Sequence, residues 1–499
     1  MRSPRSVAIK SEADMNRRAQ WHFWQLVGGL LLACFLSSYA LAQTNGLPRP
    51  PLQLGEVLAS VTNQYPPLLA ALIERDIAAG RLKSAQGTFD FNVFTRLFGT
   101  PAGYYESGTV DSGFEQFTGI WGSTVFGGYR ITRGDVLPDY YNNRTEGGGE
   151  VRLGVRVPLL RDGVIDRRRA AVIKARLDKE LADPFIQRQQ LDFIRASTVA
   201  YYNWQAAGER LRVIEGLFRI ANERTSALTN QVASGLLPRI VLTDNQRLVV
   251  SRQIGVVQAR RRFEAAALAL SLFLRTPDDE PVVARRDRLP LVFPEITAPV
   301  EPQLDVDLEL AVRSRPEIIR LELAFKKLDV DRRLARNQLL PNLDAGAFAS
   351  QDFGEKIYSD KSDFELQAGL ELRFPLQRRE AKGRLAEIEG QLEQVANEQR
   401  MAQDRIRNET RDAFSALTAA HEQTQQASLN VRLARELQAG EEEQFRRGAA
   451  DLLALQLREQ AAFDAEILAV DALAEYFRAF ADYRAATAAD LASVAKPGR

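Results

Sequence analysis

Residues 364–374 read Phe-Glu-Leu-Gln-Ala-Gly-Leu-Glu-Leu-Arg-Phe, and Pro375 follows them. Apolar or small side chains occupy every even-numbered position, while charged residues, an amide and a glycine occupy the odd-numbered ones. Because side chains alternate across a strand, this stretch predicts a strand with one apolar and one hydrophilic face. Its length matches the roughly 9–11 residues with which a tilted strand crosses a bilayer. Pro375 ends the strand, since proline cannot donate to a sheet ladder.

A very long helix is predicted directly after this strand. From about residue 377 to residue 447 there is no proline, and Ala, Leu, Glu, Gln and Arg predominate. Such a run of strong helix formers, roughly 70 residues long, gives a helix of about 105 Å. Apolar residues such as Leu385, Ile388 and Leu392 recur at spacings of three and four, which indicates coiled-coil contacts. Gly448 interrupts the run, and a second helix is predicted beyond it.

The first 42 residues are predicted to be a secretory signal peptide. Basic residues precede an apolar run at 26–36, and residues 40–42 form an Ala-x-Ala cleavage site. Cys34, the only cysteine in the 499-residue chain, is either removed with this segment or lipidated as in a lipoprotein. Beyond the signal, no apolar run approaches the ~20 residues of a membrane helix. The net charge of +1 argues against a nucleic-acid partner.

Two parts of the chain repeat one plan of helix, strands and helical hairpin, which indicates an internal duplication. Between matching prolines the first copy is about 33 residues longer than the second, which predicts an added β-hairpin. We expect these boundaries: signal peptide 1–42, first repeat 43–275, proline-rich linker 276–303, second repeat 304–490, and tail 491–499.

The strands and turns of the two repeats can be placed from the same patterns. Alternation predicts the strands, and glycines between helical runs predict the turns of the hairpins. We expect strands at 89–98 and 151–157, an extra hairpin around 110–132, strands at 342–349 and 364–374, and hairpin tips at 235 and 448.

These strands leave two possibilities for their environment. In lipid every backbone group must be hydrogen-bonded, so an open sheet cannot span a membrane. The four strands outside the extra hairpin are too few to close a barrel, because the smallest membrane barrels have about eight. Either the strands are periplasmic, or several copies of the chain share one barrel.

The whole plan resembles the TolC family of outer-membrane efflux proteins over about residues 52–490. Local matches are Arg315-Pro316-Glu317, the segment Ala-Arg-Asn-Gln-Leu-Leu-Pro at 335–341, and the turns at Gly235-Leu236 and Gly448. The resemblance implies a mixed, mainly α fold with two internal repeats. In it, long α-helical coiled-coil hairpins form a periplasmic tunnel, and a homotrimer shares a transmembrane β-barrel, which has 12 strands in the family.

The resemblance also implies a function and its partners. The chain would be the exit duct of a tripartite efflux or type I secretion system in the outer membrane of a Gram-negative bacterium. A periplasmic adaptor (membrane fusion) protein would dock at Gly235, Leu236 and Gly448 and link the duct to an inner-membrane transporter. The apolar face of the opening strand would contact outer-membrane lipid through Phe364, Leu366, Leu370, Leu372 and Phe374.

The tunnel entrance departs from the family pattern. Members often carry aspartates about six and nine positions after the second tip glycine, whereas this chain has Ala454 and Leu457 there. Asp244, nine residues after Gly235, is therefore the candidate entrance gate. The alternative for Asp244 is a solvated aspartate near the start of a helix.

No enzyme chemistry, cofactor or metal site is predicted. Beyond the signal peptide the only histidine is His421, in the middle of a long helix. The sequence contains no His-x-x-x-His or Cys-x-x-Cys motif that would bind a metal, and no glycine-rich phosphate loop. The alternative to a channel is a periplasmic coiled-coil adaptor or scaffold protein without a pore of its own.

Overall fold

The computed structural model describes residues 50–138 and 143–494. They divide into a small unit, residues 50–52 with 285–290, and a large unit that holds the others. In the small unit the N–H of Leu52 donates to the carbonyl of Arg288 at 2.8 Å. The predicted signal peptide, with Cys34, lies outside the described residues.

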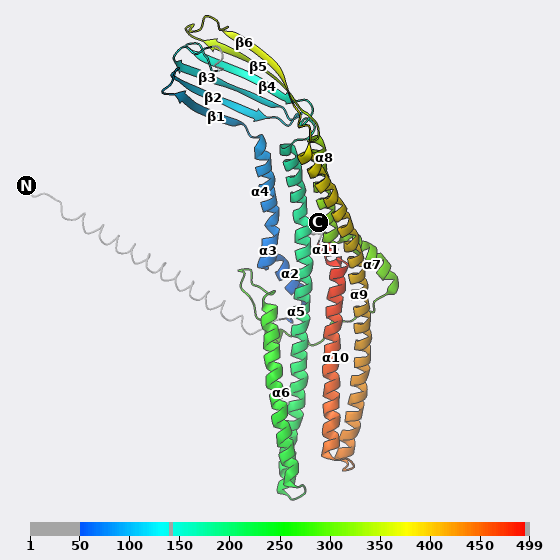
Figure 1. The fold of residues 1–499 in the computed structure, drawn as a ribbon. Coiled ribbons are helices and arrows are strands. Elements are labelled where there is room, and N and C mark those ends of the chain that lie inside the picture. Colours follow the sequence, from blue (N-terminus) through cyan, green and yellow to red (C-terminus); the bar gives the residue numbers. More distant parts are fainter. Residues whose placement is uncertain (1–49, 139–142, 495–499) are drawn as a thin grey trace, which may run out of the picture. The chain divides into compact units, whose positions relative to one another are not determined.

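The large unit contains a six-stranded antiparallel sheet whose strands follow chain order (Figure 1). Because each strand pairs with the next, β1 and β6 are its two edges. β1 begins later than the predicted start at Phe89, because Gly87–Phe89 form the 3-10 turn η2. The strands are β1 (Asn92–Thr100), β2 (Ser107–Phe117), β3 (Thr124–Gly134), β4 (Gly149–Pro158), β5 (Asn342–Phe353) and β6 (Phe364–Arg373).

Two very long helices follow the strands. α5 (Arg167–Ala233) has 67 residues and α9 (Arg379–Arg446) has 68, so each is about 100 Å long. Each turns back into a shorter helix, α6 (Arg239–Ser271) after α5 and α10 (Leu452–Ala486) after α9. α5 continues through Pro184 without ending. No helix in the described part of the chain is both long and apolar enough to cross a membrane.

Shorter helices complete the large unit. α4 leads into β1 and α8 leads into β5, so each set of strands is entered from a short helix and left through a long one. Two ion pairs hold α8 against α5: Lys327 with Asp178 at 2.5 Å and Lys174 with Asp331 at 2.8 Å. The short helices are α2 (Leu54–Gln64), α3 (Pro66–Leu72), α4 (Glu74–Gln86), α7 (Glu301–Ser314), α8 (Pro316–Asn337) and α11 (Ala489–Val494).

Aromatic residues join α5 to α10. The rings of Tyr202 and Phe477 stack with centroids 4.1 Å apart, and the fully buried Trp204 of α5 stacks on Phe263 of α6 at 6.2 Å. Phe293, from the proline-rich segment between α6 and α7, stacks on Phe477 at 5.9 Å. The amide of Gln205 also donates to the carbonyl of Val292 at 3.0 Å. Val292 and Phe293 of this segment therefore lie against α5 and α10.

The motif Arg315-Pro316-Glu317 forms an ion-pair cluster around a buried arginine where α7 meets α8. Only 7 % of the Arg315 side chain is exposed, and it pairs with Glu317 at 2.8 Å and with Glu409 of α9 at 2.7 Å. Arg188 of α5 also pairs with Glu317. The motif thus connects α8 with both long helices, which gives it a structural role.

Candidate functional site

The apolar face of β6 is exposed. Phe364, Leu366, Leu370 and Leu372 are 57–71 % exposed, and Phe374, just beyond the strand, is 41 % exposed. Large aliphatic and aromatic side chains on one face of a sheet are usually covered by a second layer. Here no element of the described chain covers them, so this face requires an apolar environment from outside the monomer.

The exposed apolar face continues across the entire sheet. Directly paired residues share a face, so one row of partners can be followed from edge to edge. Leu153 in the middle of this row is 57 % exposed, and Val93 at the β1 edge is 74 % exposed. The row runs through Val93, Phe114, Gly127, Leu153, Ala349 and Leu366.

The opposite face of the sheet carries a cluster of charged side chains. Asp111 on β2 has only 3 % of its side chain exposed. Its carboxylate accepts hydrogen bonds from Arg130 on β3 at 3.3 Å and from Arg152 on β4 at 2.5 and 2.7 Å. Because Arg152 lies two strands from Asp111, its hydrogen bonds cross β3. This cluster ties three strands together on the polar face.

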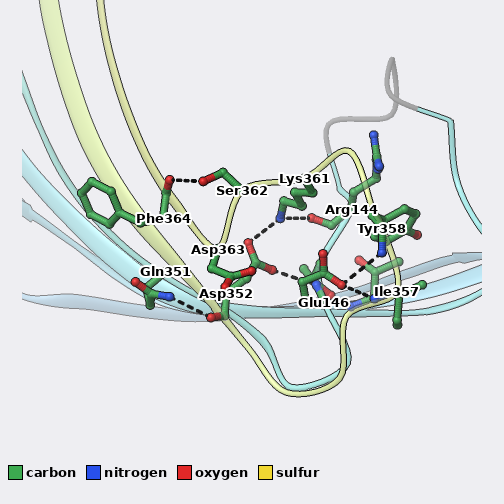
Figure 2. A network of polar contacts seen from close by, with 12 residues as sticks. Arg144, Glu146, Gln351, Asp352, Ile357, Tyr358, Lys361, Ser362, Asp363 and Phe364 are labelled. Atoms are coloured by element: carbon green, nitrogen blue, oxygen red, sulfur yellow. Dashed lines mark hydrogen bonds and ion pairs between the residues drawn. The ribbon is translucent and has the colours of Figure 1, made fainter.

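A second charged network lies where β5 turns toward β6 (Figure 2). Lys361 Nζ donates to Asp352 Oδ2 at 2.5 Å and to the carbonyl of Arg144 at 2.8 Å. The other carboxylate oxygen of Asp352 accepts the N–H of Glu146 at 2.8 Å. Asp352 is 1 % exposed and Lys361 10 % exposed at their side chains. The network therefore fixes the segment before β4 to the connection between β5 and β6.

Glu146 and Arg144 shape this connection further. One oxygen of the buried Glu146 carboxylate accepts the N–H groups of Ile357 and, at 3.2 Å, of Tyr358. Arg144 pairs with Asp360 and lies 4.2 Å from the centroid of the Tyr358 ring. The hydrogen bond from Arg144 lowers the pKa of Asp360 below its ordinary value. The connection between β5 and β6 is thus held by ionised groups at several points.

The turn between α5 and α6 is a Schellman motif. The N–H of Gly235 donates to the carbonyl of Val232 at 3.1 Å, and the N–H of Leu236 donates to Gln231 at 2.9 Å. This motif needs a residue with positive φ, and Gly235 has φ = +71°. Leu236 beyond it is 75 % exposed. An exposed leucine at the end of a hairpin is suited to contact another protein.

The turn between α9 and α10 repeats this geometry. Gly448, with φ = +74°, donates to Phe445 at 3.0 Å, and Ala449 donates to Gln444 at 2.9 Å. Asp451 then caps α10 by accepting the N–H of Ala454 at 2.7 Å. Each turn follows a helix of about 100 Å that begins near the sheet. Both predicted tip glycines therefore lie at the ends of the long helices remote from the strands.

Asp244 lies in the second turn of α6, after the first hairpin tip. Its carboxylate pairs with Arg247 at 3.3 Å, and the two side chains are 49 % and 75 % exposed. Within one chain it is a surface residue. Its role as an entrance gate stays a prediction, because a gate requires neighbouring copies.

The burial and pairing of the charged groups of the sheet could not be predicted from the sequence. Asp111, Arg152, Asp352 and Lys361 occupy hydrophilic positions in strands or their connections, where charged residues are ordinary. Only the strand register shows that they are buried and paired. Among residues 50–138 and 143–494, no group of three or more His, Cys, Asp and Glu side chains could hold a metal ion.

Comparison with known proteins identifies the fold. No protein-family model matches the chain, and no curated protein matches its sequence significantly. A membrane protein from Pseudomonas aeruginosa matches with a TM-score of 0.63 at 13 % identity, covering 88 % of this chain and 90 % of that one. VceC, an outer membrane protein from Vibrio cholerae, matches with a TM-score of 0.60 at 15 % identity, covering 87 % and 96 %.

The open state of the Neisseria gonorrhoeae outer membrane channel MtrE also matches. Its TM-score is 0.60 at 14 % identity, and the match covers 87 % of this chain and 88 % of that one. The resemblance to the TolC family is thereby confirmed at the level of a mainly helical chain with one six-stranded sheet. This chain has the fold of outer-membrane channels.

Proposed function

We propose that this chain is the outer-membrane exit duct of a tripartite efflux or type I secretion system. The observation that carries the proposal is the exposed apolar face that extends over all six strands. A surface of this kind suits contact with lipid acyl chains. The match to solved outer-membrane channels supports the same role. Substrates would pass from an inner-membrane pump across the periplasm and the outer membrane.

The two free edges of the sheet support a shared barrel. β1 and β6 each present unpaired N–H and C=O groups, which must be hydrogen-bonded inside a bilayer. In a homotrimer, β6 of one copy pairs with β1 of the next until the ring closes. The charged face of the sheet then lines the lumen, and the helical hairpins of the two repeats form the wall of a periplasmic tunnel.

The hairpin tips are the proposed docking site of a periplasmic adaptor protein. Gly235, Leu236 and Gly448 are exposed at the ends of helices that begin near the sheet. An adaptor bound there would lie on the inner-membrane side of the duct and could connect it to a transporter. Asp244, near the first tip, is the proposed gate at the tunnel entrance.

The alternative is a periplasmic adaptor or scaffold with no pore. Such a protein would expose the apolar face of the sheet to water, where it would cause aggregation unless a partner covered it. The solved structures that share the fold are channels, which favours the duct.

Fractionation of cells tests the proposal. We expect the protein in the outer-membrane fraction, released only by detergent; protein that is soluble after lysis without detergent would refute the duct.

A pair of variants sharpens the test. Leu370→Arg places a charge on the apolar face and should cost roughly 2–4 kcal/mol near the bilayer midplane, which lowers the amount of assembled protein. Gln367→Arg, on the polar face of the same strand, should assemble normally.

A further inference from the structure

The hairpin of β2 and β3 is a full part of the sheet. β1 pairs with β2 from Asn92 to Thr100, and β2 pairs with β3 from Ser107 to Phe117, with no interruption in either ladder. β3 then pairs with β4. The hairpin therefore separates β1 from β4 within a continuous sheet.

The hairpin also continues both the apolar and the polar face of the sheet. On the apolar side, Val110 and Phe114 of β2 pair with Ile131 and Gly127 of β3. On the polar side, Asp111 is bound by Arg130 of β3 and by Arg152 of β4. The second contact reaches over β3 to the main part of the sheet. A hairpin that merely lay against the barrel would need neither the continued apolar face nor this cross-strand tie.

The strands of the hairpin connect to no helix. β1 follows α4 and β4 leads to α5, whereas β2 and β3 are joined on the helical side by a short turn. In this turn the N–H of Thr118 donates to the carbonyl of Ser123 at 2.8 Å. The hairpin therefore widens the sheet without adding a helix to the tunnel.

We propose that each copy contributes six strands to the barrel, so that a trimer forms a barrel of 18 strands. The inference rests on the proposed function and departs from the 12 strands that the family resemblance implied. An even number of strands per copy leaves β1 and β6 antiparallel, as head-to-tail closure between copies requires. Because barrel diameter grows roughly linearly with strand number, this barrel is about 1.5 times as wide as one of 12 strands. The duct is then wider in the membrane than a four-stranded copy would allow.

Single cysteines bearing a fluorophore test the strand count in the full-length protein, reconstituted in vesicles with lipid-borne or aqueous nitroxide quenchers. Ser112 on β2 and Val151 on β4 lie in one row of the apolar face, because both pair with Tyr129. Ser112→Cys is a conservative change, and Val151→Cys marks a strand that belongs to the barrel at either strand count. Glu115→Cys, on the polar face of β2, is the matched control.

We expect labels at Ser112 and Val151 to be quenched several-fold more strongly by the lipid-borne quencher, and the label at Glu115 by the aqueous one. Lipid quenching at Val151 with aqueous quenching at Ser112 would place the hairpin outside the wall. That result would overturn the 18-stranded barrel and leave the proposed function intact. Aqueous quenching at both positions would overturn the proposed function as well.

Discussion

Lys361 is expected to hold the connection between β5 and β6 in place. Its ammonium group is the cation that contacts the Asp352 carboxylate, which is 1 % exposed at its side chain. Replacing Lys361 with methionine keeps an unbranched apolar side chain of similar volume but leaves this carboxylate buried without its ion pair. Removal of one partner from a buried pair costs about 3 kcal/mol or more. The equilibrium constant for the ordered form of the connection over its locally unfolded form should therefore fall roughly 100-fold.

A matched control lies in the same connection. Lys356 approaches Asp363 at 3.8 Å, and the two side chains are 56 % and 65 % exposed. Such a surface pair is worth less than about 1 kcal/mol, so Lys356→Met should change the local equilibrium less than about fivefold. Both variants remove one positive charge, which separates the effect of burial from the effect of net charge.

Hydrogen exchange of the backbone amides in residues 354–363, followed by mass spectrometry on the detergent-solubilised chain, measures this equilibrium. We expect Lys361→Met to accelerate exchange strongly and Lys356→Met to change it little. Equal exchange in the two variants would show that the buried pair does not hold the connection, and the reasoning would be wrong.

Three further predictions concern the helices. Burial would raise the pKa of Glu317, but the hydrogen bond and charge of Arg315 outweigh it and hold the pKa below its ordinary value. The stabilisation by ionised Glu317 is then present above the pKa that Glu317 has in the unfolded chain, and it is lost as the pH falls through the folded pKa. Glu317→Gln should therefore flatten the acid side of a plot of stability against pH measured by circular dichroism. An unchanged plot would contradict this. In Gly448→Ala the new methyl group meets no neighbouring atom, but the φ of +74° should lower the stability by about 1–2 kcal/mol. Gly440→Ala, inside α9, should instead raise the stability by roughly 0.5–1 kcal/mol. Thermal melting compares the two variants, and equal effects would exclude a conformational role for Gly448. Asp244→Asn should change the conductance or the cation preference of the reconstituted channel, and no change in either would remove Asp244 from the gate.

Local sequence patterns predicted much of the secondary structure. α9 was predicted at 377–447 and lies at Arg379–Arg446, because its composition alone favours helix over its whole length. β6 was predicted from strict alternation, and it begins at Phe364 as expected. Alternation was less informative for β1, because Phe89 belongs to a 3-10 turn whose residues continue the apolar pattern.

Contacts between distant segments could not be predicted in the same way. Asp352 and Glu146 are 206 residues apart, and their contact depends on the register of β4 against β5. A one-residue slip of a strand exchanges its two faces, so no charged residue could be assigned a buried partner from the sequence. The hydrogen bond between Asp111 and Arg152 could not be predicted either, because the sequence does not show that β3 lies between β2 and β4.

Labelling of cysteines in intact cells tests whether the sheet spans the outer membrane. Ser359, in the connection between β5 and β6, and Ala449, at the second hairpin tip, are both exposed. If the sheet spans the outer membrane, a membrane-impermeant maleimide should label Ser359→Cys in intact cells. The same reagent should label Ala449→Cys only after the outer membrane is permeabilised. Labelling of both positions only after permeabilisation would place the whole protein in the periplasm and contradict the account.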